Sequence, residues 1–262
     1  MNFTAKETLL DAETMWDAKA EHYHISQKRQ GMKDSYQIAE ILHKKKQLMK
    51  GTVLDVGGGV GLYAIPFATY AKSVTITDLS AKMLAYAKEN ADDVGLCNLE
   101  FVKLDWDQAD FKNLGWEKHF DLVFASMCPA IRDGESIDKM IAASKNWCCI
   151  NRFIKMKDSI AERIEAILNY SEPFDPHNNR NRVQAIFNYL WEKGFDPEID
   201  YFEETTETVF TVEEATKHYG KRFATIAENQ HVDLREIISN LAENNRLKVL
   251  RNKKLALISW QV

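Results

Sequence analysis

The chain has 262 residues, of which 45% are hydrophobic and 28% are charged, so it is long and apolar enough to bury a full globular core. Its formal net charge of −5 favours neither nucleic acid nor a membrane surface as a partner. No apolar run approaches the roughly 18 residues that a membrane span needs. The first residues lack a signal-peptide pattern, and the four cysteines form no C-x-x-C pair, so we expect a cytoplasmic protein with reduced thiols.

The first 50 residues are expected to be helical. Leu9, Trp16, Ala20 and Tyr23 recur at spacings of seven, four and three, which gives a helix one apolar face. A second helix is expected over about 35–49. We therefore predict an N-terminal helical cap over residues 1–50.

From Gly51 onward the pattern becomes an alternation of strands and helices. Short apolar or β-branched runs predict strands at residues 52–56, 73–77, 99–104, 120–125 and 147–153. Helices are expected between them, at 62–71, after a cap at Ser80, and at 137–144. Continuous apolar strands that alternate with helices indicate a parallel sheet covered on both faces.

After residue 155 the alternation loosens. Helical patterns and two capping boxes occupy much of this part, whereas residues 199–210 are extended in character and 255–262 form a last strand. We therefore expect one α/β domain over residues 51–262, with helical insertions at about 156–195 and 211–246. Together with the N-terminal helices, the insertions are expected to form a lid.

A glycine-rich turn follows the first strand of this domain. Gly57, Gly59 and Gly61 can adopt positive φ angles and let a ligand approach the backbone, and the helix that follows offers unpaired N–H groups. A dinucleotide fingerprint has the spacing G-x-G-x-x-G, which this turn does not match because residue 62 is Leu. The acidic Asp55 beside the turn disfavours a pyrophosphate and suits a cationic or zwitterionic ligand.

Acidic residues also end the next two strands. Asp78 lies 23 residues after Asp55, and a carboxylate there can accept hydrogen bonds from both hydroxyls of a ribose. Asp105 could bond an adenine amine and Trp106 could cover the ring. For Asp105 the alternative is a helix cap, and for Trp106 it is ordinary core packing.

These features together resemble the class I S-adenosylmethionine-dependent methyltransferases. The resemblance covers about residues 51–155 and rests on the run D-x-G-x-G-x-G, the acidic strand end, the Asp105-Trp106 pair and the fourth strand. It implies a doubly wound, Rossmann-like α/β fold with a seven-stranded sheet, parallel except for one strand, here 255–262. It also implies S-adenosylmethionine as the cofactor, S-adenosylhomocysteine as the product and methyl transfer to a small-molecule acceptor.

The resemblance further implies a set of residues that contact the cofactor: Tyr23, Asp55, Gly57, Gly58, Gly59, Gly61, Asp78, Leu79, Met83, Asp105, Trp106 and Ser126. The glycine turn would contact the methionine part, Asp78 the ribose and Asp105 the adenine. Tyr23 would reach the cofactor carboxylate, with simple packing as the alternative. Leu79 and Met83 would lie beside the adenine, although core packing explains them equally well.

Methyl transfer from a sulfonium needs mainly alignment of the acceptor, and a general base when the acceptor is a hydroxyl or an ammonium group. The candidate bases are His22, His24 and His218. His22 and His24 have no third ligand near in sequence, so no metal site is expected. The fourth strand lacks the N/D-P-P-Y/F-like motif that grips planar amino groups, which argues against a nucleic-acid target.

Three points stay open at this level. Arg180 and Arg182 are either a clamp for an acidic substrate or part of a solvated loop. An NAD-dependent oxidoreductase is one alternative function, and the glycine spacing and Asp55 argue against it. A non-catalytic S-adenosylmethionine-binding module is another, since no acid–base residue is firmly assigned. The acceptor atom and the oligomeric state do not follow from the sequence.

Overall fold

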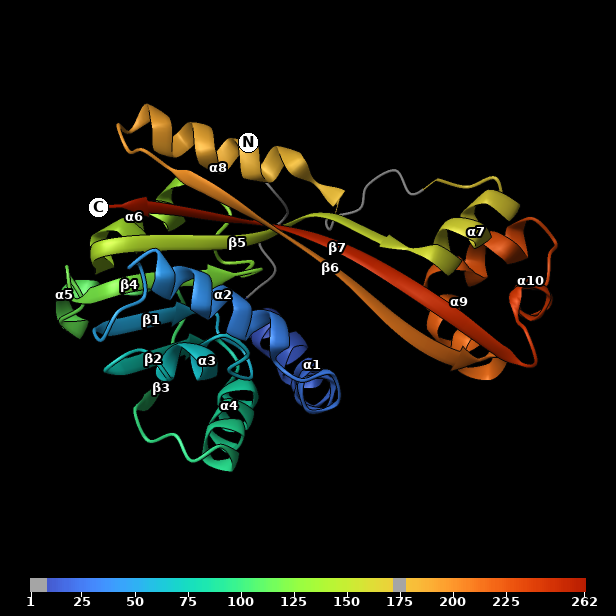
Figure 1. Ribbon diagram of the computed structural model, residues 1–262, viewed down its shortest axis with the longest axis horizontal. Helices are drawn as coiled ribbons and strands as arrows, with labels where there is room; N and C mark the ends of the chain where they lie inside the picture. The colour runs from blue at the N-terminus through green and yellow to red at the C-terminus, as the bar shows by residue number, and fades with distance from the viewer. Residues whose placement is uncertain (1–8, 172–177) are drawn as a thin grey trace. The chain divides into compact units, whose positions relative to one another are not determined.

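A computed structural model describes residues 9–171 and 178–262 of the chain (Figure 1). Its helices are α1 (Leu9–Gln30), α2 (Lys33–Lys44), α3 (Ala64–Ala68), α4 (Ala81–Asp93), α5 (Phe111–Leu114), α6 (Gly134–Ala143), α7 (Ser159–Ile167), α8 (Arg180–Glu192), α9 (Val212–Asn229) and α10 (Leu234–Leu241). Its strands are β1 (Thr52–Val56), β2 (Ser73–Asp78), β3 (Leu99–Lys103), β4 (Phe120–Ser126), β5 (Ser144–Asp158), β6 (Glu198–Thr211) and β7 (Arg246–Gln261).

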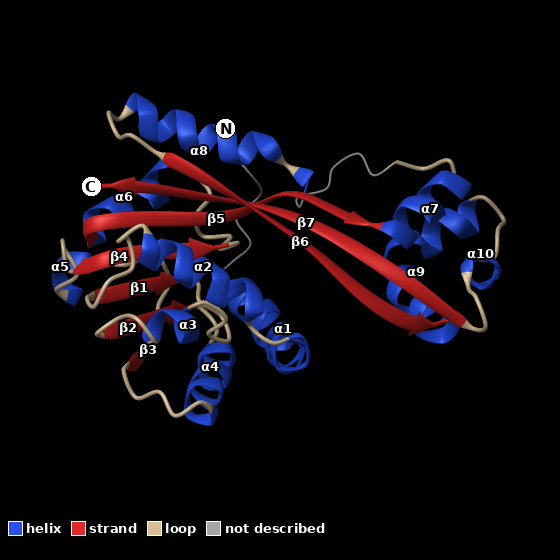
Figure 2. Ribbon diagram, in the orientation of Figure 1, coloured by secondary structure: helices blue, strands red, loops and turns tan. Residues whose placement is uncertain are grey.

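The strands form one seven-stranded sheet in the order β3-β2-β1-β4-β5-β7-β6. Strands β1 to β5 pair in parallel, with Val56 of β1 opposite Thr77 of β2 and Ser126 of β4 opposite Asn151 of β5. Strand β7 runs against β5, as the arrows in Figure 2 show. The expected seven-stranded α/β sheet is therefore confirmed.

The strand order reverses at β1, which has β2 on one side and β4 on the other. Because crossovers between parallel strands are right-handed, α3 and α4 lie on one face of the sheet and α6 lies on the other. The loops that follow β1 and β4 therefore diverge, which opens a crevice at the carboxyl ends of these strands. In this class of fold such a crevice is the usual place for a ligand.

The central strands are buried on both faces, as their continuous apolar sequences predict. Every residue from Val53 to Val56 is buried, and so is every residue from Leu122 to Ala125. The four cysteines, all within the described residues, form no disulfide: Cys128, Cys148 and Cys149 are buried and Cys97 is exposed. None of the helices in the described part of the chain is both long enough and apolar enough to span a bilayer.

The described chain divides into two compact units. Of the described residues, the first contains 9–151, 186–199 and 258–262, and the second contains 152–171, 178–185 and 200–257. The unit boundaries fall inside β5, α8, β6 and β7, so these four elements contribute residues to both units. The carboxyl ends of β1 to β4 belong to the first unit.

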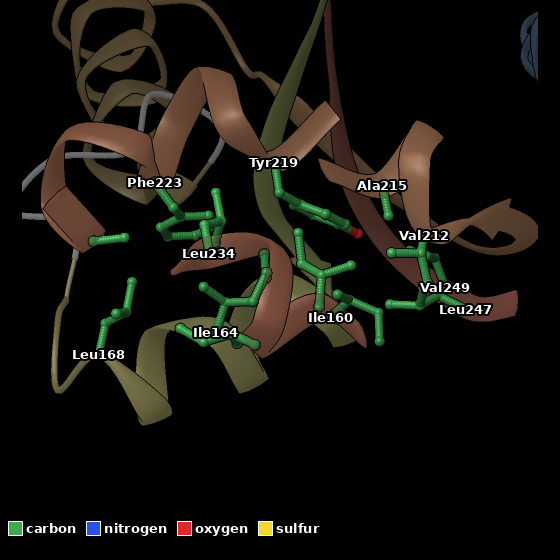
Figure 3. Close-up of a cluster of buried hydrophobic side chains, with 14 residues drawn as sticks. Ile160, Ile164, Leu168, Val212, Ala215, Tyr219, Phe223, Leu234, Leu247 and Val249 are labelled. Carbon is green, nitrogen blue, oxygen red and sulfur yellow. The ribbon is translucent and has the colours of Figure 1, made fainter. Parts of the chain in front are cut away.

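The second unit has a hydrophobic core of its own (Figure 3). Helices α7, α9 and α10 contribute Ile164, Phe223 and Ile238, which are fully buried, and β7 contributes Val249. Thr211 and Glu214 form the expected capping box before α9. Before α10 the Asp233 carboxylate accepts a hydrogen bond from the N–H of Arg235 and not from that of Glu236, so this helix has a simple cap in place of the expected box.

Removing a side chain from the core of the second unit should lower the stability of the protein. Phe223→Ala removes a fully buried ring, so the free energy of unfolding should fall by about 3–5 kcal/mol. Lys221→Ala, on the same helix but exposed, should change it by less than about 0.5 kcal/mol. Urea denaturation of the three proteins measures the difference. A loss for Phe223→Ala no larger than the loss for Lys221→Ala would contradict the assignment of this core.

Candidate functional site

The turn after β1 has a backbone that requires glycine. Gly57, Gly59 and Gly61 have φ angles of 65°, 55° and 84°, in the left-handed region that L side chains rarely adopt. Gly58 has no room for a side chain, because a Cβ atom there would lie 2.7 Å from the Asp55 carboxylate. Its N–H donates to the Thr77 carbonyl at 2.9 Å, which ties the turn to β2. The resulting surface of bare backbone can accommodate the close approach of a ligand.

Asp55 lies beneath this turn and is only 1% exposed. Among the described residues its Oδ2 atom has no hydrogen-bond partner, whereas the N–H of Ala64 bonds to the carboxylate. Burial raises the pKa of Asp55 to about 7, and the negative charge of Asp78 adds to the rise. A buried carboxyl group with an unpaired oxygen is costly in the free protein, and a cationic partner would relieve that cost.

Asp78, at the end of β2, has both carboxylate oxygens fixed by the backbone. Oδ2 accepts the N–H of Gly59 at 3.0 Å, and Oδ1 accepts the N–H of Ser80 at 2.9 Å. Burial raises the pKa of Asp78, while these bonds and one from the Leu79 N–H oppose the rise. The three N–H groups thus use three of about four acceptor positions on the carboxylate, and one position remains for a ligand.

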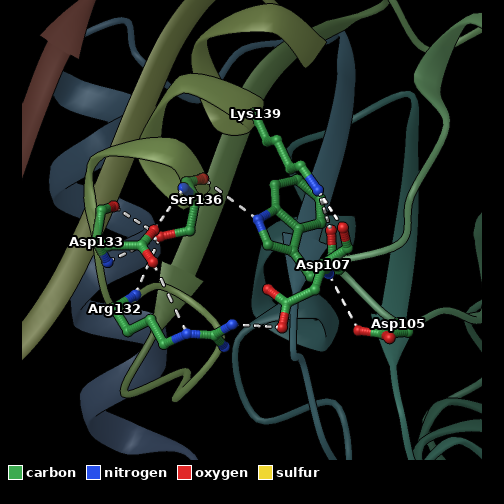
Figure 4. A network of polar contacts seen from close by, with 7 residues as sticks. Asp105, Asp107, Arg132, Asp133, Ser136 and Lys139 are labelled. Carbon is green, nitrogen blue, oxygen red and sulfur yellow. Dashed lines mark hydrogen bonds and ion pairs between the residues drawn. The ribbon is translucent and has the colours of Figure 1, made fainter. Parts of the chain in front are cut away.

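Asp105 and Trp106 follow β3 in a loop that is fastened to α6 (Figure 4). Asp105 Oδ1 accepts the N–H of Asp107 at 3.0 Å. Trp106 is buried, and its indole N–H donates to the Ser136 carbonyl at 3.2 Å. Its ring packs 5.1 Å from the Phe111 ring. Trp106 thus serves as a packing anchor for the loop that carries Asp105.

Two cations hold the same loop from the α6 side. Lys139 Nζ donates to the Trp106 carbonyl at 3.1 Å and to the Asp107 carbonyl. Arg132 Nη2 donates to Asp107 Oδ2 at 2.6 Å, and Figure 4 shows the side chains of Lys139 and Arg132 reaching the loop. The loop is therefore fixed at both its backbone and its side chains.

Ser126 ends β4 within a small polar cluster. Asn151 Nδ2 donates to Ser126 Oγ at 3.1 Å and to the Tyr63 hydroxyl at 2.9 Å. Burial raises the pKa of Tyr63 to about 12, so its hydroxyl is neutral at physiological pH. Two residues further on, Cys128 lies against the glycine turn, because a Cβ on Gly57 would meet its Sγ at 2.5 Å. The ends of β1 and β4 are thus in contact.

Helix α1 covers the glycine turn and α4. Ala20, Val60 of the turn and Met83 of α4 form one buried cluster, with Trp16 and Tyr86 packed against it. Met83 therefore packs in the core, whereas Leu79 is half-buried. This contact explains why an apolar helix face precedes the first strand.

The aromatic and histidine side chains of α1 point in different directions. Tyr23 is 47% exposed, and its ring meets those of Trp16 and His22 edge to face, each at 6.3 Å. His24 is buried, stacks on Tyr86 at 4.3 Å and has Nε2 3.4 Å from a Glu89 oxygen. His22 is exposed. The cofactor role of Tyr23 and the catalytic roles of both histidines stay predictions.

His218 belongs to the second unit. Its Nε2 lies 2.9 Å from Arg251 Nη2, and Arg251 Nε in turn donates to Asp158 at 2.9 Å. Burial and the Arg251 charge lower the pKa of His218. Its catalytic role also stays a prediction. Across the described residues, no His, Cys, Asp or Glu group has the arrangement of a metal site.

Several residues that shape the site carry no motif in the sequence. Asn151 and Tyr63 are brought to Ser126 only by strand pairing and by the turn after β1. Asp17 of α1 accepts the Ser80 hydroxyl proton at 2.5 Å, although 63 residues separate them. Ser80 is predicted from sequence as a helix cap, and it does cap α4 by accepting the Met83 N–H at 3.0 Å. Its contact with Asp17 has no sequence signal.

Comparison with known proteins agrees with this geometry. Residues 53–148 match a family model described as a methyltransferase domain. The matched segment runs from β1 into β5 and contains the glycine turn, Asp78 and Asp105. A search of curated proteins gave no match.

Solved structures share the fold at low sequence identity. A protein of Bacillus halodurans C-125, described as a candidate methyltransferase, is 17% identical with a TM-score of 0.53, over 88% of this chain and 98% of that one. Magnesium protoporphyrin IX methyltransferase from Synechocystis PCC 6803, solved with bound S-adenosylmethionine, is 14% identical with a TM-score of 0.51, over 96% of this chain and 99% of that one.

Precorrin-6y C5,15-methyltransferase from Geobacter metallireducens GS-15 is 10% identical, with a TM-score of 0.52 over 86% of this chain and 87% of that one. These similarities establish a Rossmann-like α/β fold. Residues 53–148 are in addition similar to a methyltransferase domain.

Proposed function

We propose that the protein transfers a methyl group from S-adenosylmethionine to a small-molecule acceptor, with the cofactor held across the carboxyl ends of β1, β2 and β3. The observation that carries the proposal is the Asp78 carboxylate, which the N–H groups of Gly59 and Ser80 hold beside the glycine turn. Its remaining acceptor position suits a hydroxyl of a ribose.

The other strand ends fit the rest of this ligand. The bare backbone of the glycine turn suits the methionine part, and the negative charge and unpaired oxygen of Asp55 favour a cationic group close by. We assign the adenine to the loop of Asp105, with Leu79 and Met83 as neighbours. Tyr23 and Ser126 complete the proposed contacts.

The bound sulfonium supplies an electrophilic methyl group, so the protein has mainly to align the acceptor and to exclude water. The N-terminal cap of residues 1–50 and the insertions at about 156–195 and 211–246 are the proposed lid. Ser126 and Cys128 mark the side from which the acceptor approaches, because the end of β4 touches the glycine turn. His22, His24 and His218 remain the candidate bases for an acceptor that must lose a proton.

The proposed acceptor is a small molecule, and an acidic one is the first candidate. The net charge of −5 and the segment Ser126-Met127-Cys128-Pro129, which lacks the motif that grips planar amino groups, argue against a nucleic-acid acceptor. Arg180 and Arg182 of α8 are the candidate clamp for a carboxylate. The atom that receives the methyl group is not part of the proposal.

Methyl transfer itself is tested with S-adenosylmethionine carrying a deuterated methyl group and with extracts of small metabolites. We expect S-adenosylhomocysteine to accumulate together with an acceptor whose mass has increased by the labelled methyl group. Binding of S-adenosylhomocysteine without transfer to any metabolite would contradict the proposal and would favour the non-catalytic binding module. Quenching or enhancement of NADH fluorescence on mixing would instead favour the oxidoreductase.

The role of Asp78 is tested by calorimetry with S-adenosylhomocysteine. Asp78→Ala removes the acceptor of a charge-assisted hydrogen bond, so the dissociation constant should rise by about tenfold or more. Asp92→Ala, which removes an exposed carboxylate from α4, is the matched control and should bind like the wild type. Full binding by Asp78→Ala would contradict the assignment of the ribose.

The raised pKa of Asp55 couples cofactor binding to pH. In the free protein Asp55 is largely protonated below pH 7, and a bound cationic ligand favours its ionised form, so its pKa should fall on binding. We therefore expect S-adenosylmethionine to release up to one proton when it binds at pH 6, and little at pH 9. Calorimetry in buffers with different ionisation enthalpies measures this release.

Asp55→Asn provides the control for the coupling, because it removes the titrating group and keeps the shape of the side chain. Its proton release at pH 6 should be smaller than that of the wild type by the contribution of Asp55. Equal release by the two proteins would show that another group titrates and would contradict the role given to Asp55.

A further inference from the structure

Ser80 is fully buried, and its N–H and its hydroxyl together make three hydrogen bonds. Its N–H donates to Asp78 Oδ1 at 2.9 Å, and its hydroxyl oxygen accepts the Met83 N–H at 3.0 Å, which caps α4. Its hydroxyl proton goes to Asp17 Oδ1 of α1 at 2.5 Å. Since a hydroxyl has only one proton, Asp17 decides where that proton points.

The same bonds continue to the glycine turn. The other oxygen of Asp78 accepts the Gly59 N–H at 3.0 Å. A continuous path of hydrogen bonds therefore runs from α1 through Ser80 and Asp78 to the turn. Asp17 also accepts the Lys82 N–H at 3.3 Å, so it is attached to the start of α4 at two points.

We propose that Asp17 is a positioning residue for the cofactor's ribose, because it holds Ser80, whose N–H binds the carboxylate of Asp78. The proposal rests on the proposed function and goes beyond the cofactor contacts given there. Asp17 fixes the Ser80 hydroxyl and the Lys82 N–H, and the Ser80 N–H in turn fixes Asp78 Oδ1. Without Asp17, Ser80 is held less firmly, so the Asp78 carboxylate is less well placed to bind the ribose.

Other contacts hold α1 to the first unit without involving Ser80. Lys28 pairs with Glu89 at 2.9 Å and with Asp93 at 3.2 Å, and both acidic residues lie on α4. Lys103 pairs with Glu13 at 2.6 Å. Only exposed side chains take part in the Lys28 pairs, so removing them loosens α1 slightly and leaves the polar path intact. Lys28→Ala is therefore a matched control for a purely mechanical role of α1.

The experiment measures the affinity of the full-length protein for S-adenosylhomocysteine by calorimetry. Asp17→Ala should raise the dissociation constant about tenfold, which corresponds to the loss of one hydrogen-bond arrangement. Asp17→Asn should recover most of the affinity, because its amide oxygen still accepts the Ser80 proton. Lys28→Ala should bind like the wild type. An equal loss for Lys28→Ala and Asp17→Ala would overturn the proposal in favour of simple tethering.

Analogues of S-adenosylhomocysteine that lack the 2′- or the 3′-hydroxyl give a readout that a structural role would not move. Removing a hydroxyl should weaken binding to the wild type more than binding to Asp17→Ala, because in the variant Asp78 is less well placed to accept a hydrogen bond from that hydroxyl. An identical penalty in the two proteins would overturn the proposal. Thermal unfolding of each variant checks that it is folded.

The failure of this inference is distinguishable from the failure of the proposed function. A wild-type protein that does not bind S-adenosylhomocysteine would overturn both. Wild-type binding together with unchanged affinity in Asp17→Ala would overturn only the role of Asp17. In the double variant Asp17→Ala/Ser80→Ala, the loss should be no larger than in Ser80→Ala alone, since both changes interrupt one path.

Discussion

The parallel pairing of β1 with β2 is the interaction on which the site depends. The pairing places Val56 opposite Thr77, so that Asp55 and Asp78 come to the same edge of the sheet with the glycine turn between them. Burial and the nearby charge of Asp78 raise the pKa of Asp55, which is unfavourable for its ionised form unless hydrogen bonds or a cation compensate. The turn supplies the Gly59 N–H to Asp78, and among the described residues Asp55 Oδ2 has no hydrogen-bond partner. A sulfonium or ammonium group beside Asp55 would supply the missing partner.

The elements around this edge keep its geometry fixed. Helix α1 buries Val60 and Met83 and reaches the start of α4 through Asp17. On the other side, Trp106 and Lys139 fasten the Asp105 loop to α6. Preorganised hydrogen-bond acceptors need little rearrangement when a ligand binds, so most of the binding free energy remains available for affinity. The N-terminal helices and the loop after β3 are therefore as much part of the site as the glycine turn.

The fold could be predicted from the sequence largely because its central strands are continuously apolar and end in acidic residues. Strand lengths were harder to predict. Strands β5 and β7 extend well beyond their apolar segments, because residues such as Lys155 and Lys248 have charged side chains in solvent yet keep extended backbones. Helix α3 spans only Ala64–Ala68 of the expected 62–71, since the turn continues to Tyr63 and the helix ends at Thr69. The second unit's separate core arises from contacts between α7, α9 and α10, which periodicity within each helix does not reveal.

The position of Asp78 at the end of β2 was predictable from the sequence, and its contact with the ribose stays a proposal. The site was not predictable where a role arises from contacts between distant segments, such as Asp17 with Ser80 or Asn151 with Tyr63, because these depend on packing angles and on strand register. For Trp106, the position after β3 could be read from the sequence and suggests an adenine contact. The hydrogen bond from its indole N–H to Ser136 on α6 could not be read from the sequence.

The central claim, that the carboxyl ends of β1, β2 and β3 hold the cofactor, is tested most directly by a crystal structure of the protein grown with S-adenosylhomocysteine. We predict a ribose hydroxyl within hydrogen-bond distance of Asp78 and the homocysteine part against the glycine turn. A ligand bound elsewhere, or one whose ribose does not contact Asp78, would contradict the account.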